Sequence, residues 1–212
     1  MGYITQDSSG IPDKQLYKSL AMHFKKGLFA PRMIELEKAR ELKDLDLKGD
    51  TITNLNFLRY FPNLEELNIS APNLKDISGL RYTEKLDWLQ ILDHNLTDIS
   101  AVDYCRELTF LNISTDGGNE LGKPPAIWDF RAIGNCTNLN TLVLTNNNIN
   151  DISWICDLKS LTEVYLANNP ITDFSPLKEL ENLGFIEISR DQPFNQEEFP
   201  EIPVEYNEIV IK

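Results

Sequence analysis

The sequence is poor in the residue types and patterns that mark membrane, metal-binding and nucleic-acid-binding proteins. Its apolar runs extend over only a few residues, so no segment predicts a membrane-spanning helix. Only 3 cysteines and 2 histidines occur, and the cysteines lack the spacing of a metal-binding motif. Lys and Arg number 20 against 33 Asp and Glu, and the formal net charge of −13 argues against a surface that reads nucleic-acid phosphates. We therefore expect no membrane insertion, no metal, no cofactor and no nucleic-acid partner.

The remaining composition is that of an acidic globular protein. Hydrophobic residues make up 42% of the 212 residues and charged residues 25%, which suffices for one well-buried core. The excess of acidic residues favours basic partners. Because 3 cysteines cannot all pair with one another, at least one thiol is expected to be free.

A leucine that recurs every 22 residues organises most of the chain. The step from Leu108 to Leu139 is 31 residues, which is 22 plus a nine-residue insertion. Each of these leucines begins the pattern L-x-x-L-x-L, whose last two apolar residues alternate with an exposed one, as in a short strand. Later apolar positions at spacings of three predict a tight, 3₁₀-like segment. The first leucines are Leu42, Leu64, Leu86, Leu108, Leu139, Leu161 and Leu183.

One strand and one tight turn make a coil that cannot bury its apolar side alone. Stacked coils share a core and pair their strands in parallel, so the predicted fold class is an α/β solenoid. We expect a flexible N-terminal spacer, a cap with helices near 12–28 and 32–41, seven repeats, and a C-terminal cap ending in strand-like residues 208–212. These parts occupy residues 1–10, 11–41, 42–190 (with an inserted rim loop near 115–126) and 191–212.

Two stretches of the repeat region carry a specific motif. Residues 149–153 read Ile-x-Asp-Ile-Ser, and residues 161–173 read Leu-Thr-x-Val-Tyr-Leu-Ala-Asn-Asn-Pro-Ile-Thr-Asp. Together with Ile11-Pro12-Asp13 near the start, they resemble the 22-residue leucine-rich repeats of bacterial internalin-like proteins. The resemblance implies a right-handed solenoid with a concave parallel sheet, a short 3₁₀ or helical convex side and a helical N-terminal cap. It also implies protein recognition, often at a bacterial surface.

The ninth repeat position departs from this pattern. The expected asparagine, which bonds backbone groups between coils, is present only as Asn147 and Asn169. We therefore expect less regular turns in the N-terminal repeats. The residues that replace it there are Asp50, Pro72, His94 and Asp116.

An acidic residue recurs twelve places after most first leucines. A row of carboxylates could bind calcium. However, each precedes an apolar residue, and several are followed by Ile-Ser, which is typical of an Asx turn or helix N-cap. We interpret the row as caps. It consists of Asn54, Asp76, Asp98, Asp129, Asp151 and Asp173.

The other candidate chemistry is also weak. Cys105 and Cys136 occupy an apolar repeat position and are expected in the core, where a disulfide between them would need specific geometry. Residues 117–123 fit the phosphate-loop pattern G-x-x-x-x-G-K, but Pro124 stands where the Ser or Thr should be. As a rim loop the insertion is either a recognition element or a tolerated insertion. We predict no catalytic residues and no enzymatic activity.

The outward positions of the predicted strands hold the best candidates for a binding site. Several are large and apolar, although the solenoid needs none of them for its core, which is the anatomy of a binding patch. The alternative is that Trp88 and Phe110 only pack on each other across adjacent strands. The candidate partner-binding residues are Trp88, Gln90, Leu92, Phe110, Asn112, Val143, Tyr165 and Phe185.

The leading functional prediction is a monomeric module that binds a protein partner through its concave face. Host and cell-surface proteins are the candidates that the family resemblance suggests. The alternative is a glycan or cell-wall fragment that stacks on the same aromatic residues. The resemblance implies a secreted or cell-surface location, whereas the absence of a signal peptide after Met1 predicts a cytoplasmic one if Met1 is the native start.

Overall fold

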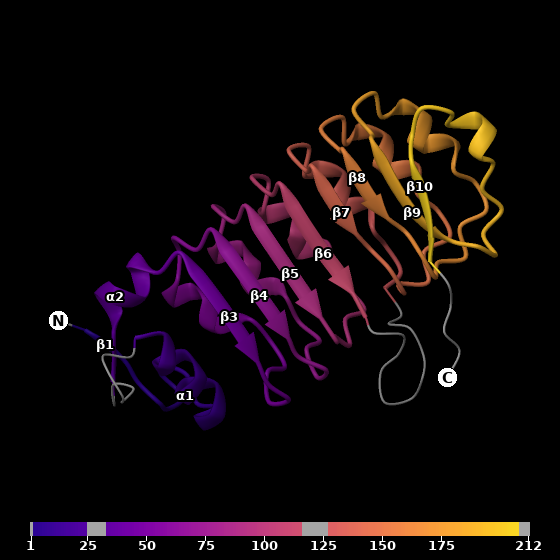
Figure 1. Cartoon of the computed structure of the whole chain (residues 1–212). Coiled ribbons are helices and arrows are strands. Elements are labelled where there is room, and N and C mark those ends of the chain that lie inside the picture. The colour runs from indigo at the N-terminus through magenta and orange to yellow at the C-terminus, as the bar shows by residue number, and fades with distance from the viewer. Residues whose placement is uncertain (1, 25–32, 116–126, 208–212) are drawn as a thin grey trace.

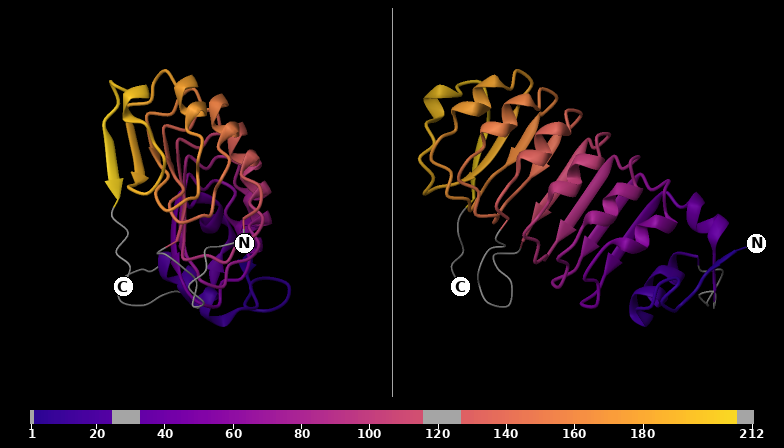
Figure 2. Two further views of the ribbon diagram at one scale, coloured as in Figure 1. Left: turned by 90° about the vertical axis from the view of Figure 1, so that its right-hand side faces the viewer. Right: turned by 180° about the vertical axis from the view of Figure 1, so that it is seen from behind.

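The computed structural model describes residues 2–24, 33–115 and 127–207 of the chain. They form a solenoid of stacked coils, with strands along one side and short helical turns along the other, as Figure 1 and Figure 2 show. The strands build one parallel sheet, which is the concave side that the repeat predicts. The predicted α/β solenoid is therefore confirmed.

Neighbouring strands of this sheet follow one another in chain order. Equivalent repeat positions pair, so that Leu67 lies opposite Leu89, and Leu89 opposite Leu111. Because successive side chains of a strand point to opposite faces, this register places the repeat leucines on the inner face together. The strands are β3 (Asp44–Lys48), β4 (Glu66–Ser70), β5 (Trp88–Leu92), β6 (Phe110–Ser114), β7 (Thr141–Val143), β8 (Glu163–Tyr165), β9 (Phe185–Ser189) and β10 (Val204–Asn207).

One continuous apolar core fills the solenoid from cap to cap. It runs from Ile4 near the start of the chain to Phe199 in the C-terminal cap, and Leu67, Leu89 and Leu111 are completely buried within it. Burying one such side chain contributes about 1.5–3 kcal/mol. Most of that burial is made between coils, so each coil depends on its neighbours for stability.

The convex side consists of 3₁₀ turns, each opened by the acidic or amide residue of the predicted row. The side chain of each of these residues accepts a hydrogen bond from the backbone N–H two residues later, at 2.7–3.1 Å. The Asx-turn interpretation is therefore confirmed over the calcium hypothesis. The turns are η1 (Asn56–Tyr60), η2 (Ser78–Tyr82), η3 (Ser100–Tyr104), η4 (Arg131–Asn135), η5 (Ser153–Asp157) and η6 (Ser175–Glu179).

The N-terminal residues differ from the prediction of a flexible spacer over residues 1–10. Strand β1 (Tyr3–Ile4) pairs antiparallel with β2 (Ile34–Glu35), and Ile4 is buried. The Tyr17 hydroxyl donates a hydrogen bond to the Ile4 carbonyl at 2.9 Å, which ties β1 to α1 (Lys14–His23). The spacer prediction is thus wrong from Tyr3 onward, because these residues supply a strand and an apolar side chain to the cap.

The predicted helices are shorter than expected. Helix α1 begins after Asp13, whose carboxylate accepts a hydrogen bond from the Leu16 N–H at 2.7 Å, and it ends before Phe24. The remaining predicted residues, 25–28, lie outside the described ranges. Helix α2 (Leu36–Glu41) leads into the first repeat.

The C-terminal cap adds one strand to the sheet. Strand β10 pairs in parallel with β9, and the turn η7 (Gln196–Glu198) precedes it. The strand predicted over residues 208–212 lies outside the described residues, and β10 ends just before it. The Gln192 side-chain amide donates a hydrogen bond to the Asn169 carbonyl at 2.7 Å, which connects this cap to the preceding coil.

Two buried asparagines connect the C-terminal coils. The Asn169 amide donates to the Leu144 carbonyl at 2.8 Å, and its oxygen accepts from the N–H groups of Asn147 and Ile149 at 3.1 and 2.9 Å. His94 holds the equivalent position in an earlier coil and is also buried. The N-terminal strands β3 to β6 nonetheless pair over five residues each without a break in register, so the irregularity expected of these turns does not reach the sheet.

His94 is an imperfect substitute for asparagine. Its Nδ1 accepts from the Leu96 N–H at 3.3 Å, while within the described ranges Nε2 has no hydrogen-bond partner. Burial lowers the pKa of His94 from 6.5 to about 4. The folded chain therefore keeps His94 neutral in mildly acidic solution, where the unfolded chain protonates it.

This difference predicts an acid-sensitive contribution to stability. As the pH falls from 6.5 towards 4, the unfolded chain takes up a proton that the folded chain does not, so the free energy of unfolding drops by about 3 kcal/mol over that window. A His94→Asn variant lacks this titration and should lose less stability over the same range. Urea denaturation of both chains at pH 7, 5.5 and 4.5 measures the difference. Parallel pH dependence of the two chains would contradict the assignment.

Candidate protein-binding surface

The outward positions of the strands form a continuous face along the concave side, called here the concave face. On β3 to β8 these positions are exposed or half-buried and alternate with buried ones, and on β9 Phe185 and Glu187 are half-buried whereas Ser189 is buried. All eight predicted partner-binding residues lie on this face, because the strands align without a shift of register. They are Trp88, Gln90 and Leu92 on β5, Phe110 and Asn112 on β6, Val143 on β7, Tyr165 on β8 and Phe185 on β9.

Trp88 and Phe110 form a stacked pair on adjacent strands. Their ring centroids are 3.6 Å apart and their planes differ by 5°. The indole Nε1 donates a hydrogen bond to the Asn68 side-chain oxygen at 3.2 Å, which fixes the ring against β4. Packing does not hide the residue, since Trp88 remains 39% exposed. The rings therefore do pack on each other, as the structural alternative proposed, and Trp88 still presents a rigid aromatic surface to solvent.

Tyr165 and Phe185 form a second aromatic pair further along the face. Their centroids are 5.3 Å apart and their planes are tilted by 43°. The Tyr165 hydroxyl donates to a Glu163 carboxylate oxygen at 3.2 Å. Burial and the charge of Glu163 raise the pKa of Tyr165, so its hydroxyl stays protonated and acts as a donor.

Polar and aliphatic residues lie between the two aromatic pairs. The Asn112 side-chain amide donates to the Gln90 side-chain oxygen at 3.4 Å, across β5 and β6. Val143 on β7 continues the same row towards Tyr165, with which it is paired in register. The middle of the concave face is therefore uncharged.

Acidic residues border this uncharged middle on both sides. Among the outward residues of the described strands, Lys48 is the single cation. A shallow hollow of about 360 Å³ lies at the β3–β5 end, with Asp46, Lys48, Glu66 and Trp88 in its lining. The outward carboxylates are Asp44, Asp46 and Glu66 on β3 and β4, and Glu163, Glu187 and Glu205 on β8 to β10.

Comparisons with known proteins agree with this geometry. Residues 127–189 match the family model described as leucine-rich repeats (2 copies). An internalin from Listeria monocytogenes superposes with a TM-score of 0.66 at 23% identity, over 93% of this chain and 63% of the other. The fold is the leucine-rich-repeat solenoid of the internalins.

Two further solved structures support the same fold. Internalin C2 from Listeria monocytogenes gives a TM-score of 0.60 at 19% identity, over 92% of this chain and 94% of its own. A leucine-rich-repeat protein from Leptospira interrogans gives 0.59 at 22% identity, over 82% of this chain and 51% of its own. No curated protein sequence matches the chain. The descriptions of the matched family and structures name internalins and leucine-rich-repeat proteins.

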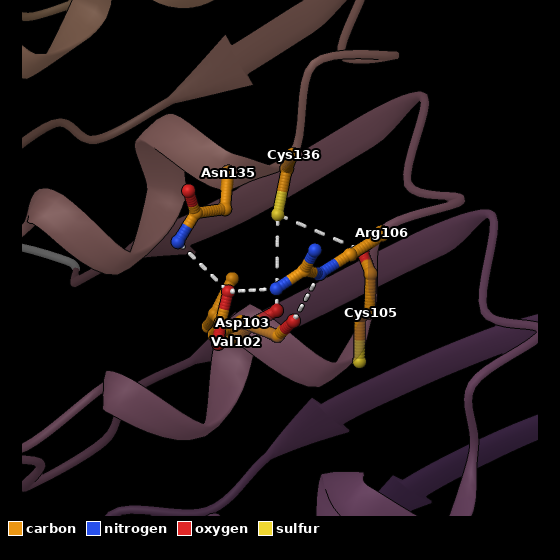
Figure 3. A network of polar contacts seen from close by, with 6 residues as sticks. All are labelled: Val102, Asp103, Cys105, Arg106, Asn135 and Cys136. Atoms are coloured by element: carbon orange, nitrogen blue, oxygen red, sulfur yellow. Dashed lines mark hydrogen bonds and ion pairs between the residues drawn. The ribbon is translucent and has the colours of Figure 1, made fainter.

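Two of the three cysteines of the leucine-rich-repeat solenoid, Cys105 and Cys136, are core residues, as predicted, whereas Cys156 is half-buried. Cys105 and Cys136 are buried and free, and burial raises the pKa of both thiols to about 12. Figure 3 shows the Cys136 sulfur directed at the backbone of the preceding coil, 3.5 Å from the Cys105 carbonyl oxygen, while the Cys105 sulfur points elsewhere. Protonated, enclosed thiols are poor nucleophiles.

A metal site or a membrane-spanning helix would indicate another class of function. Within the described ranges, no group of three or more His, Cys, Asp or Glu side chains is arranged to hold a metal ion. None of the helices there combines the length and the apolar composition that crossing a membrane requires. The predicted rim loop and its G-x-x-x-x-G-K pattern over residues 117–123 lie outside the described residues.

One prominent exposed side chain was not among the residues predicted from the sequence. Trp128, just before the Asx turn of its coil, is 84% exposed. Alignment of the repeats would have revealed it, because the equivalent position holds a small or charged polar residue in the other coils. Those residues are Thr53, Lys75, Thr97, Asn150 and Thr172.

Two substitutions on β5 compare how much the inner and outer faces of the sheet contribute to stability. Leu89→Ala should lower the free energy of unfolding by about 3 kcal/mol, because it opens a cavity in the core. Trp88→Ala should cost only about 1 kcal/mol, since it removes one stacking contact from a partly exposed ring. Denaturant titration of both variants makes the comparison. Equal losses in the free energy of unfolding would show that Trp88 is needed for stability and is not a surface residue available for binding.

Proposed function

We propose that this leucine-rich-repeat solenoid is a protein-binding module that recognises its partner through the concave face. The observation that carries the proposal is the set of aromatic rings on the outward side of the sheet, whose inner side alone builds the core. Contiguous apolar surface rimmed by polar residues marks interaction sites on soluble proteins.

The make-up of the face supports a protein partner. Tryptophan and tyrosine are the residue types most enriched at the energetic centres of protein interfaces, where charged residues are depleted. Here the Trp88 and Phe110 rings and the amides of Gln90 and Asn112 lie on β5 and β6, which carry no outward charge. The carboxylates lie to either side, on β3 and β4 and on β8 to β10. The stacked Trp88 ring is already held in place, so binding orders few additional side chains.

The relatives support the same class of function without naming a ligand. Their descriptions are of internalins and a leucine-rich-repeat protein from bacteria. A bacterial surface location belongs to the proposal through the family resemblance of the repeats. The chain spans 63% of the first of these structures, so activities of a whole internalin transfer to it only as proposals. Nothing in these descriptions favours the glycan alternative.

Substitution of the aromatic anchors tests the proposal. Ligands selected from a random-peptide display library against the wild-type chain serve as probes, and isothermal calorimetry measures their affinity. Trp88→Ala and Tyr165→Ala should each weaken binding by about tenfold or more, while the thermal unfolding of both variants remains cooperative.

The matched control is Tyr104→Ala. Tyr104 is 51% exposed at the end of η3 on the convex side, so its removal deletes an aromatic ring of similar exposure elsewhere. Binding should be unchanged in this variant. Ligands that tolerate both concave substitutions, or that depend on Tyr104, would refute recognition through the concave face.

A further inference from the structure

We infer that the partner is cationic, and that two of its Arg or Lys side chains bind where an aromatic ring of the concave face lies beside carboxylates. The inference rests on the proposed function, because it names the chemistry of the partner that the concave face would bind. Two separate places on the face carry it.

The first place is the hollow at the β3–β5 end. Phe110 covers one side of the Trp88 ring, and the hollow lies on the opposite side, towards β4. Asp46 and Glu66 line the same hollow. A guanidinium or ammonium group seated there meets the face of an indole and two carboxylates, the combination that attracts cations most strongly. Lys48, at the carboxyl end of β3, leaves the carboxylates of the lining in excess.

The second place surrounds Tyr165. Glu163 accepts its hydroxyl hydrogen, Glu187 is its register partner on β9, and Glu205 is the register partner of Glu187 on β10. The charges of Glu163 and Glu205 both act on Tyr165. A cation from the partner, placed over the Tyr165 ring, gains the attraction of the ring and of these two carboxylates.

The positions of the two places restrict the shape of the ligand. The hollow lies towards β4 and Tyr165 lies on β8, four strands apart. At about 4.8 Å per strand this is roughly 19 Å. An extended segment advances about 3.3 Å per residue, so one that crosses the strands places its two cations about six residues apart. The net charge of −13 also favours approach of a basic partner over a distance.

Two properties of the peptides selected from the display library test the inference. The first is their sequence, and the second is their affinity for variants of the chain in which carboxylates are neutralised. The peptides should be enriched in Arg and Lys, with pairs about six residues apart. The double variants Asp46→Asn with Glu66→Gln, and Glu163→Gln with Glu205→Gln, keep size and hydrogen bonding but remove charge. Each should bind the peptides about tenfold more weakly than wild type.

The matched control is Asp157→Asn with Glu179→Gln. These residues end η5 and η6 on the convex side, so the control changes net charge by the same amount away from the concave face. It should alter affinity by less than about twofold, because these charges act on the peptide only over a long distance, where salt screens them.

The possible outcomes separate the inference from the proposed function. Peptides that need Trp88 and Tyr165 but lack an excess of Arg and Lys, or that tolerate both double variants, would overturn the inference and leave the proposed function standing. Failure to select any peptide, or peptides indifferent to Trp88→Ala and Tyr165→Ala, would overturn both.

Discussion

The structure depends on one constraint, which is that a single coil cannot bury its own apolar side. Each repeat brings leucines to the inner face of its strand, and they become inaccessible to water only when the next coil is stacked on them. This requirement fixes the register of the sheet, because a shift by one residue would turn every core side chain outward. It also explains the caps, in which Ile4 at one end and Phe199 at the other close the core.

The same constraint leaves the outer face of the sheet free to vary. A strand uses alternate positions for the core, so the remaining positions can change without loss of the fold. On this chain they hold a stacked Trp88–Phe110 pair, a tilted Tyr165–Phe185 pair and flanking carboxylates. Function is therefore best sought where the repeat imposes no residue type, and the proposed binding surface occupies those positions.

The repeat region could be predicted from the sequence because equivalent positions of successive repeats can be compared with one another. This comparison predicted the strands, the Asx turns and the burial of Cys105 and Cys136, and the spacing also put the candidate rings on one face. In the N-terminal cap, where nothing repeats, the two helices were predicted, although too long, but strand β1 was not. A strand as short as Tyr3–Ile4 has no periodicity to detect, and its formation depends on a partner some thirty residues away. The sequence also could not predict that the Trp88 ring stays partly exposed while it stacks on Phe110, because its exposure depends on how the side chains pack.

The central claim is that the concave face, and not the convex turns, contacts the partner. Hydrogen–deuterium exchange of the chain with and without a saturating selected ligand tests this most directly, because backbone amides of the strands and of the 3₁₀ turns report separately. Added protection is expected to concentrate in β4 to β9 and to be smallest in η2 to η6. Protection confined to the convex turns, with the strands unchanged, would contradict it.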